Sequence, residues 1–177
     1  ATPLDGADSP RGELDPSFYS AIDGPYNAFS PATGDIGFDD YSSIAADDII
    51  LTSFRFVGGV AEDDGTMSFQ FFNADEELVD SFGVTLPAGN FIWTITLNSE
   101  VIIPANGIIQ ASVGEGFTGQ WFLGATLPTI GTNDNIFGGA NGGELSHRFE
   151  LNGVLVPTPG AVALLGMAGF AATRRRR

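Results

Sequence analysis

The stretch TMSFQF, residues 66–71, decides the fold class because polar and apolar side chains alternate along it. Met67, Phe69 and Phe71 fall on one side of an extended chain, and the polar residues between them fall on the other side. A helix would bring every third or fourth residue to one face, so this spacing predicts a β-strand. One face of that strand would enter a core, and the other would face water.

The same alternation recurs in four other segments of the chain. Their apolar positions are Phe82, Val84 and Leu86; Phe91, Trp93, Ile95 and Leu97; Trp121, Leu123, Ala125 and Leu127; and His147, Phe149 and Leu151. Turn-forming sequences separate the runs, at residues 63–65, 87–90, 106–107 and 141–143. No segment between them has helical periodicity, which leaves no crossover helices for parallel pairing. The sequence therefore predicts an all-β fold, an antiparallel two-sheet β-sandwich that is jelly-roll-like and has about eight or nine strands.

Three regions of the chain differ in composition. Residues 1–34 contain five prolines, so we expect an irregular surface segment with one short strand at Phe18 to Ile22. Residues 35–156 carry the alternating runs and would form the β-sandwich domain. Residues 157–177 would form a separate C-terminal segment, because the prolines at its start cannot donate to a β-ladder.

The charge of the chain excludes several classes of protein. Its 22 acidic residues outnumber seven cations, all of them arginine, and the net charge is −15. Four of those arginines end the chain, so without them the net charge falls by four more, to −19. A body of that charge repels nucleic acid. The absence of cysteine excludes disulfides, thiolate zinc sites and cysteine nucleophiles.

The C-terminal segment combines an apolar run with a cluster of positive charge. No charged residue occurs between Gly160 and Thr173, and we expect a short apolar helix that begins at Pro159. Such a helix would be about 22 Å long at ~1.5 Å per residue, shorter than a hydrocarbon core of ~30 Å. Snorkelling arginines would make it a marginal membrane anchor, with the arginines in the cytoplasm and the acidic domain outside. The alternative is a helix that packs on the domain and places its arginines beside acidic side chains.

This order of features resembles the PEP-CTERM sorting signal of exported bacterial proteins. The matching parts are a proline-rich start, the apolar run and the basic end, with the key residues Pro157, Thr158, Pro159, Gly160, Arg174, Arg175, Arg176 and Arg177. Thr158 departs from the named motif, which has glutamate there. The resemblance implies a secreted protein of a biofilm-forming Gram-negative bacterium, held transiently in the inner membrane. It also implies recognition of the tail by exosortase, a membrane protease, and an association with exopolysaccharide.

Catalysis finds little support in the sequence. His147 is the only histidine, and its phase with Phe149 and Leu151 predicts a half-buried strand residue, not a general base. No nucleophile elbow, zinc-protease pair or phosphate-binding loop occurs. Two carboxylates from distant strands could still meet for glycoside cleavage, but in a chain with 22 acids the sequence does not single out such a pair. We therefore expect a protein that is not an enzyme.

Calcium is the one metal that the acidic segments suggest. Acids and amides cluster in loop-like positions, and the candidate ligands are Asp39, Asp40, Asp63 and Asp64. Calcium takes six to eight oxygen ligands, which the loops of a β-sandwich can supply. No calcium-binding loop motif is present, and the favoured interpretation is that these acids are solvated turns that keep the protein soluble. No other cofactor is expected.

Carbohydrate binding would need exposed aromatic rings. Strand phase places Trp93 and Trp121 in the core, and it turns Phe122 outward. Tyr19, Tyr26 and Tyr41 fall in loop-like regions and are the other candidates for a sugar site. Self-association is a separate hypothesis, because an exposed edge strand of a sandwich accepts a partner strand.

These observations together predict an exported, non-enzymatic structural protein of the cell surface or extracellular matrix. The alternatives are a lectin-like or calcium-dependent carbohydrate-binding module, and a subunit of a self-assembling filament or sheath. The first residue is Ala1, not methionine, which fits either a removed signal peptide or a shortened sequence.

Overall fold

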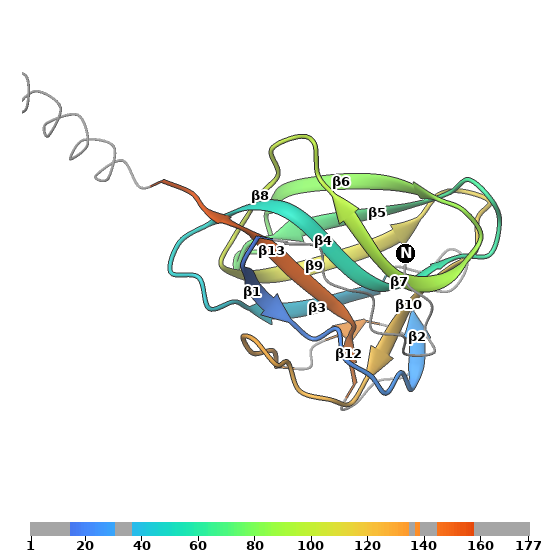
Figure 1. The fold of residues 1–177 in the computed structure, drawn as a ribbon, viewed down its shortest axis with the longest axis horizontal. Helices are drawn as coiled ribbons and strands as arrows, with labels where there is room; N and C mark the ends of the chain where they lie inside the picture. Colours follow the sequence, from blue (N-terminus) through green and yellow to red (C-terminus); the bar gives the residue numbers. More distant parts are fainter. Residues whose placement is uncertain (1–14, 31–36, 135–136, 139–144, 158–177) are drawn as a thin grey trace, which may run out of the picture.

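The computed structural model describes residues 15–30, 37–134, 137–138 and 145–157, and these residues form two antiparallel β-sheets (Figure 1). The two sheets enclose one hydrophobic core, as in a β-sandwich. The described residues contain no helix. The all-β, antiparallel, two-sheet prediction is therefore confirmed, and the finer expectation of a jelly-roll-like arrangement stays a prediction.

The larger sheet has eight strands in its described part. They are β1 (Ser17–Ser20), β2 (Ala28–Ser30), β4 (Ile49–Val60), β7 (Gly89–Thr96), β8 (Ile102–Ile103), β10 (Gly119–Gly124), β12 (Ser146–His147) and β13 (Phe149–Leu155). Strand β4 is central and pairs with four others. Phe56 lies between Trp93 of β7 and Phe149 of β13, while Gly58 lies between β7 and β10. Strands β13 and β10 thus follow one another along the same edge of β4, and the sheet curls where one replaces the other (Figure 1).

The smaller sheet has the strand order β11-β3-β9-β5-β6. Its strands are β3 (Gly37–Ser42), β5 (Gly65–Phe72), β6 (Leu78–Leu86), β9 (Asn106–Val113) and β11 (Phe137–Gly138). Met67, Phe69 and Phe71 of β5 are fully buried, and the residues between them are partly exposed. The alternation read from residues 66–71 therefore describes this strand correctly.

Aromatic rings from both sheets fill the core. The ring centroid of Phe54 on β4 lies 4.6 Å from that of Phe69 and 6.3 Å from that of Phe149. Trp93 is 7% exposed, and its indole N–H donates to the Gly58 carbonyl at 2.7 Å. Close aromatic pairs stabilise a core beyond the area that they bury, by about 0.5–1.5 kcal/mol each.

Two glycines let β4 come close to its neighbours. A Cβ atom on Gly58 would lie 2.1 Å from the Gln120 carbonyl oxygen, and one on Gly59 would lie 1.9 Å from that of Gly89. Gly59 also has a φ of +151°, which L side chains rarely adopt. Only glycine fits at this crossing of the strands.

Several finer expectations differ from the structure. The described residues form thirteen strands instead of about eight or nine, because several strands have only two to four residues. Asn106-Gly107 begins β9 and is not a turn. Ser17–Ser20 overlaps the short strand expected at Phe18 to Ile22, but it pairs with β13, and Tyr19 and Ala21 lie in the core instead of at the surface. The helix expected from Pro159 to Thr173 lies outside the described residues.

Within the described part of the chain, no helix is long and apolar enough to cross a membrane.

Candidate functional site

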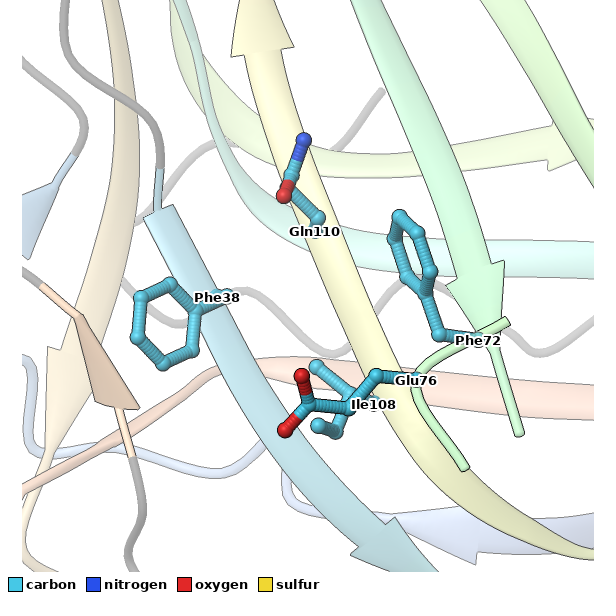
Figure 2. Close-up of a pocket in the computed structure, with 5 residues that line it drawn as sticks. All are labelled: Phe38, Phe72, Glu76, Ile108 and Gln110. Atoms are coloured by element: carbon cyan, nitrogen blue, oxygen red, sulfur yellow. The ribbon is translucent and has the colours of Figure 1, made fainter. Parts of the chain in front are cut away.

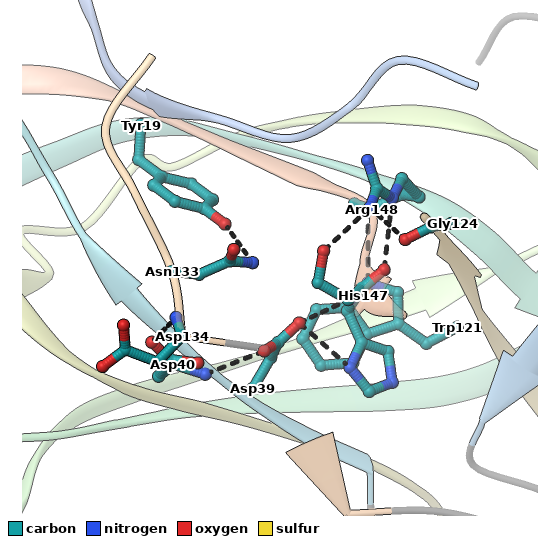
Figure 3. Close-up of polar contacts among 10 residues, drawn as sticks. Tyr19, Asp39, Asp40, Trp121, Gly124, Asn133, Asp134, His147 and Arg148 are labelled. Atoms are coloured by element: carbon teal, nitrogen blue, oxygen red, sulfur yellow. Dashed lines mark hydrogen bonds and ion pairs between the residues drawn. The ribbon is translucent and has the colours of Figure 1, made fainter. Parts of the chain in front are cut away.

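A group of polar side chains is sealed between the two sheets (Figure 3). Asp39 of β3 and His147 of β12 are both fully buried. The Asp39 Oδ2 atom accepts a hydrogen bond from the backbone N–H of His147 at 2.5 Å, and Oδ1 accepts one from the backbone N–H of Asp40 at 3.0 Å. The His147 ring stacks on Trp121 of β10, with ring centroids 4.0 Å apart. His147 is therefore more deeply buried than the half-buried position predicted from its phase, because its strand is covered on both faces.

Burial sets the protonation of this group. Desolvation lowers the pKa of His147 to about 3, and the positive charge of Arg148 lowers it in the same direction. Desolvation also raises the pKa of Asp39 well above its ordinary value, although the N–H groups of His147 and Asp40 oppose that shift. The His147 Nδ1 atom lies 3.6 Å from the Asp39 carboxylate, but a histidine with this pKa is neutral at pH 7. The contact is therefore not an ion pair at neutral pH.

Arg148 is the second buried group, and backbone carbonyls surround its guanidinium. Its Nε atom donates to the Ser146 carbonyl at 3.1 Å, and Nη1 donates to the carbonyls of Asp23 at 3.4 Å and Thr126 at 2.9 Å. Its Nη2 atom donates to the Gly124 carbonyl and to the Ser146 hydroxyl. These bonds use all five N–H groups of the side chain. Arg148 joins the loop after β1 to the end of β10, and this buried cluster is suited to holding the fold together.

The outer face of the smaller sheet carries a hollow that is open to solvent (Figure 2). The hollow has a volume of ≈ 260 Å³ and is lined by Phe38, Phe72, Glu76, Ile108 and Gln110. The strand register explains this grouping, because Phe38 pairs with Gln110 and Phe72 pairs with Ile108. Cross-strand partners share one face of a sheet. Three adjacent strands, β3, β9 and β5, thus place apolar and amide side chains together.

Gln110 lines the polar side of the hollow and is bonded to a second amide, that of Gln70. The Gln110 Nε2 atom donates to Gln70 Oε1 at 2.9 Å, and both residues lie on the same outer face. This bond uses one of the two N–H groups of Gln110. The two amides fix each other's orientation and keep further donors and acceptors directed along the face.

Glu76 reaches the hollow from the β5–β6 hairpin. Asn73 shapes this hairpin, because its Oδ1 atom accepts from the backbone N–H groups of Asp75 and Glu77 at 3.0 and 2.9 Å. Glu76 has a φ of +60°, in the left-handed region that glycine, asparagine and aspartate adopt more readily. Figure 2 shows its side chain extending from the hairpin over β9 toward β3. The hairpin therefore holds a carboxylate over the apolar floor in a backbone conformation that is uncommon for glutamate.

Among the described residues, positive charge is lacking around the hollow. The described residues include two arginines: Arg55 on β4, and Arg148 between β12 and β13. Arg55 pairs with Glu150 at 2.7 Å, and the guanidinium of Arg148 is enclosed by carbonyl oxygens. Within the described part of the chain, the hollow can offer a ligand apolar surface, amides and a carboxylate, but no cation.

The four acids considered for calcium do not come together. Asp39 is level with Phe71 of β5 through their common partner Ile109, whereas Asp64 precedes Gly65 at the other end of β5. At ~3.3 Å per residue, the two ends are about 20 Å apart. Asp40 accepts a hydrogen bond from the backbone N–H of Asp134, and Asp63 accepts one from that of Ala88. Both carboxylates therefore help to hold the backbone of a connecting segment in place. The described residues contain no group of three or more side chains that could hold a metal ion.

The aromatic candidates for a sugar site separate into two groups. Trp93 and Trp121 are buried, as predicted from strand phase. Tyr19 and Tyr41 were expected in loops, but β1 and β3 place them in the core, where burial raises the pKa of each. Phe122 does face outward, and there it packs on two neighbours. These are Tyr26 and Phe29, each with a ring centroid 6.1 Å from that of Phe122.

The hollow itself was missed in the sequence, although one signal was present. Phe72 continues β5 directly after Phe71, so it breaks the alternation and must lie on the outer face. Phe38 likewise precedes the buried Asp39 and is 36% exposed. Apolar residues on the wet face of a strand are typical of a binding surface. Their meeting point depends on the register of β3, β9 and β5, which the sequence alone does not give.

Comparisons of the chain with protein families, curated proteins and solved structures gave no match. The fold and the site geometry are therefore the basis for a functional proposal.

Proposed function

We propose that this chain is an exported structural protein of the bacterial cell surface or extracellular matrix, sorted by its C-terminal segment. The observation that carries the proposal is the separation of charge along the chain. All 22 acids precede Pro157, and four of the seven cations form the last four residues, behind a run without charge. Exosortase would recognise this tail in the inner membrane, and the acidic domain would face the exterior.

The geometry of the domain supports a role without catalysis. Its histidine and its most strongly shifted carboxyl group, His147 and Asp39, are sealed in the core, where no substrate reaches them. Arg148 is occupied by carbonyl oxygens of the domain itself. These three groups, which could otherwise act as a base, an acid and an anion clamp, thus serve the fold. The acidic exterior that remains would keep the domain soluble outside the cell.

The proposal is tested in the native host by replacing the four terminal arginines with glutamine. Guanidinium groups are costly to move through hydrocarbon, and each gains about 1 kcal/mol near an anionic cytoplasmic leaflet. We expect the glutamine variant to be misrouted and to keep its tail. Cell fractionation and the C-terminal mass of the recovered protein are the measurements. Replacement by four lysines keeps the charge and is the matched control, which should preserve most of the sorting.

Normal processing of the glutamine variant, at the wild-type rate and in the same compartment, would contradict the proposal. The arginines would then be docked on the acidic domain, and charge reversal at acidic surface positions of the domain should change thermal stability only in the chain with the native arginines.

A further inference from the structure

In its described part, the outer face of the smaller sheet is mostly polar, and its apolar side chains gather near the hollow, where Leu78 of β6 pairs with Phe72 and is 53% exposed. Strand β5 exposes Thr66, Ser68 and Gln70 on this face before it reaches Phe72. Ile108 of β9 is the cross-strand partner of Phe72, and Phe38 lies on β3, on the other side of β9, opposite Gln110. An apolar floor at one end of a mostly hydrophilic face indicates a ligand that has both an apolar surface and hydrogen-bonding groups.

We propose that this hollow binds an uncharged polysaccharide, one sugar ring at a time, with Phe38 and Phe72 against the C–H face of the ring. The amides of Gln70 and Gln110 and the carboxylate of Glu76 then receive the hydroxyl groups. A sugar ring has an apolar face of C–H groups and a rim of hydroxyls, and the lining of the hollow has the same division. The proposal rests on the proposed function only for the source of the polysaccharide, the matrix in which the protein would lie.

Charge complementarity selects an uncharged chain over an anionic one. Among the described residues that line the hollow, Glu76 is the only charged one, and Asp40 is the register partner of Ile108. Neither described arginine lines the hollow: Arg55 forms an ion pair with Glu150, and Arg148 donates to backbone carbonyls. Uronate polymers, nucleic acid and anionic lipid surfaces would be repelled by these carboxylates. Neutral hydroxyl groups can instead donate hydrogen bonds to Glu76.

The size of the hollow fits a single ring of a longer chain. Its volume of ≈ 260 Å³ lies below the ~300 Å³ at which pockets for drug-sized ligands begin. A cofactor with several rings would not be enclosed. A polysaccharide can place one ring in the hollow while its neighbours lie along the strands, and repeated contacts along such a chain raise the apparent affinity.

The conformation of Glu76 is consistent with a binding role. A glutamate at φ +60° costs stability, and such positions persist where the surrounding structure holds them in place. Asn73 holds the hairpin backbone in this conformation, because its Oδ1 atom accepts hydrogen bonds from the N–H groups of Asp75 and Glu77. The carboxylate is thereby directed over Ile108 before any ligand arrives, which lowers the entropic cost of binding.

The test is affinity electrophoresis of the purified full chain in native gels. Gels contain dextran, a β-1,3-glucan or a galactomannan as neutral probes, and alginate as the anionic probe. The net charge of −15 drives migration of the unbound protein. We expect at least one neutral polysaccharide to retard the chain and alginate to leave it unaffected. Dissociation constants come from the retardation at a series of polysaccharide concentrations.

Variants of the hollow have matched controls elsewhere on the surface. Phe38→Ala and Glu76→Gln should each weaken binding by about tenfold, the loss expected for a stacking ring or a charged hydrogen bond. Phe29→Ala removes a ring that is 46% exposed on the larger sheet, and Glu115→Gln neutralises an exposed carboxylate after β9. Both controls should bind within about twofold of the wild type. Circular dichroism checks that each variant folds. If one of them does not fold, Gln110→Ala repeats the test at a third position.

Two results would overturn the proposal. In the first, no neutral polysaccharide retards the chain, or the hollow variants bind as the controls do. In the second, sedimentation shows a dimer that Phe38→Ala abolishes, and the hollow then binds a second copy of the chain. The binding assay uses purified protein, so its outcome does not depend on sorting. The chain with four terminal glutamines should bind normally even where it is misrouted in the host.

Discussion

The carboxylate of Asp39 accepts a hydrogen bond from the backbone N–H of His147, and this bond joins the two sheets. Asp39 belongs to β3 of the smaller sheet, and His147 belongs to β12 of the larger one. The next residue, Arg148, connects the larger sheet to the loops around Asp23 and Thr126. Polar bonds in a low-dielectric interior are strong when they are complete and costly when one partner is lost. The buried cluster should therefore control stability more than any surface charge does.

Arg148→Lys should destabilise the fold by about 2–4 kcal/mol, because an ammonium group cannot reproduce the five donors of a guanidinium. Carbonyls of Gly124 and Thr126 would lose their donor while still buried or half-buried. Arg55→Lys is the control: its ion pair with Glu150 is largely buried, but it is a single contact that the charge of lysine can still make, so the loss should be smaller, about 1 kcal/mol. Chemical denaturation of both variants measures the difference. Equal losses would show that the carbonyl network around Arg148 contributes nothing special.

Acid should destabilise the protein partly through His147. Its pKa is about 3 in the folded state and about 6.5 in an unfolded chain. Between these values the unfolded state binds more protons, so stability falls as the pH drops from 6.5 toward 3, by up to about 1.4 kcal/mol per pH unit. Asp39 acts in the opposite direction, because its raised pKa lets the folded state hold a proton that the unfolded state releases. Two neighbouring charges add to these shifts. Arg148 stays positively charged over this pH range and lowers the pKa of His147, and Asp40 on β3 raises the pKa of Asp39.

His147→Gln isolates the histidine contribution. Glutamine does not titrate, so the variant should lose less stability than the wild type between pH 6.5 and 4, whatever its stability at pH 7. Denaturation at half-unit steps of pH, repeated in an Asp39→Asn background, separates the two groups. Parallel curves for wild type and His147→Gln would mean that the histidine is not buried as a neutral ring.

Much of the fold follows from the sequence because alternation records burial directly. The buried faces of β5 and the positions of Trp93 and Trp121 were predicted from phase alone. The predicted number of strands was too low because two-residue strands such as β8 and β12 contain too few residues to show a period. Burial of His147 was underestimated for another reason. Residues 146–153 are buried on both faces, and a period of two assumes that one face is wet.

The site was less accessible to prediction than the fold. Arg148 is surrounded by backbone carbonyls, and one of them, that of Asp23, lies more than a hundred residues away in the sequence. A carbonyl oxygen belongs to every residue, so no sequence motif marks it. The four candidate calcium ligands form two pairs in the sequence. The register places Asp39 and Asp40 level with the end of β5, whereas Asp63 and Asp64 lie before its start. Phe72 breaks the alternation of polar and apolar residues in the sequence. Only the register shows that Phe38 on β3 and Phe72 on β5 both lie next to β9, on the same face. Register depends on turn geometry and on burial of a whole face, and a single strand does not reveal it.

Glu76→Gly should raise stability by about 0.5–1 kcal/mol while weakening polysaccharide binding. Glycine adopts φ +60° without the steric cost that a Cβ atom brings, and this gain exceeds the added entropy of the unfolded chain. Asp75→Gly is the control in the same hairpin, where φ is not positive and glycine should lower stability. Thermal melting measures both variants. A lower melting temperature for Glu76→Gly than for the wild type would show that the conformation of Glu76 is not strained.

Calcium should stabilise the chain no more than magnesium does. Asp39 and Asp40 lie about 20 Å from Asp63 and Asp64 along the strands, so no described site offers the six to eight oxygens that calcium needs. Both ions should relieve some repulsion among 22 acids. Melting temperatures in EDTA, calcium and magnesium at equal ionic strength make the comparison. A shift specific to calcium would require a site that includes residues beyond the described ranges.

Gly59→Ala should destabilise the fold by about 3 kcal/mol or more, because β4 passes its neighbours there without space for a side chain. The new Cβ atom would lie 1.9 Å from the Gly89 carbonyl oxygen, and its residue would keep a φ of +151° that alanine rarely adopts. Relief would require β4 to move away from β7, which would pull Trp93 from its bond to the Gly58 carbonyl. Overpacking of this kind is one of the mechanisms by which a single substitution greatly lowers the free energy of unfolding.

Gly83→Ala on β6 is the matched control for this prediction. Its Cβ atom would meet nothing closer than the Ser68 hydroxyl at 3.6 Å, and its φ lies outside the left-handed region. Alanine there should be neutral or stabilise the strand by about 0.5–1 kcal/mol, since glycine loses more entropy on folding. Denaturant unfolding followed by tryptophan fluorescence reports both variants, because Trp93 and Trp121 are buried. If Gly59→Ala unfolds at the same denaturant concentration as Gly83→Ala, then β4 is not held against β7 and β10 as closely as the structure shows, and the curl of the larger sheet must have another cause.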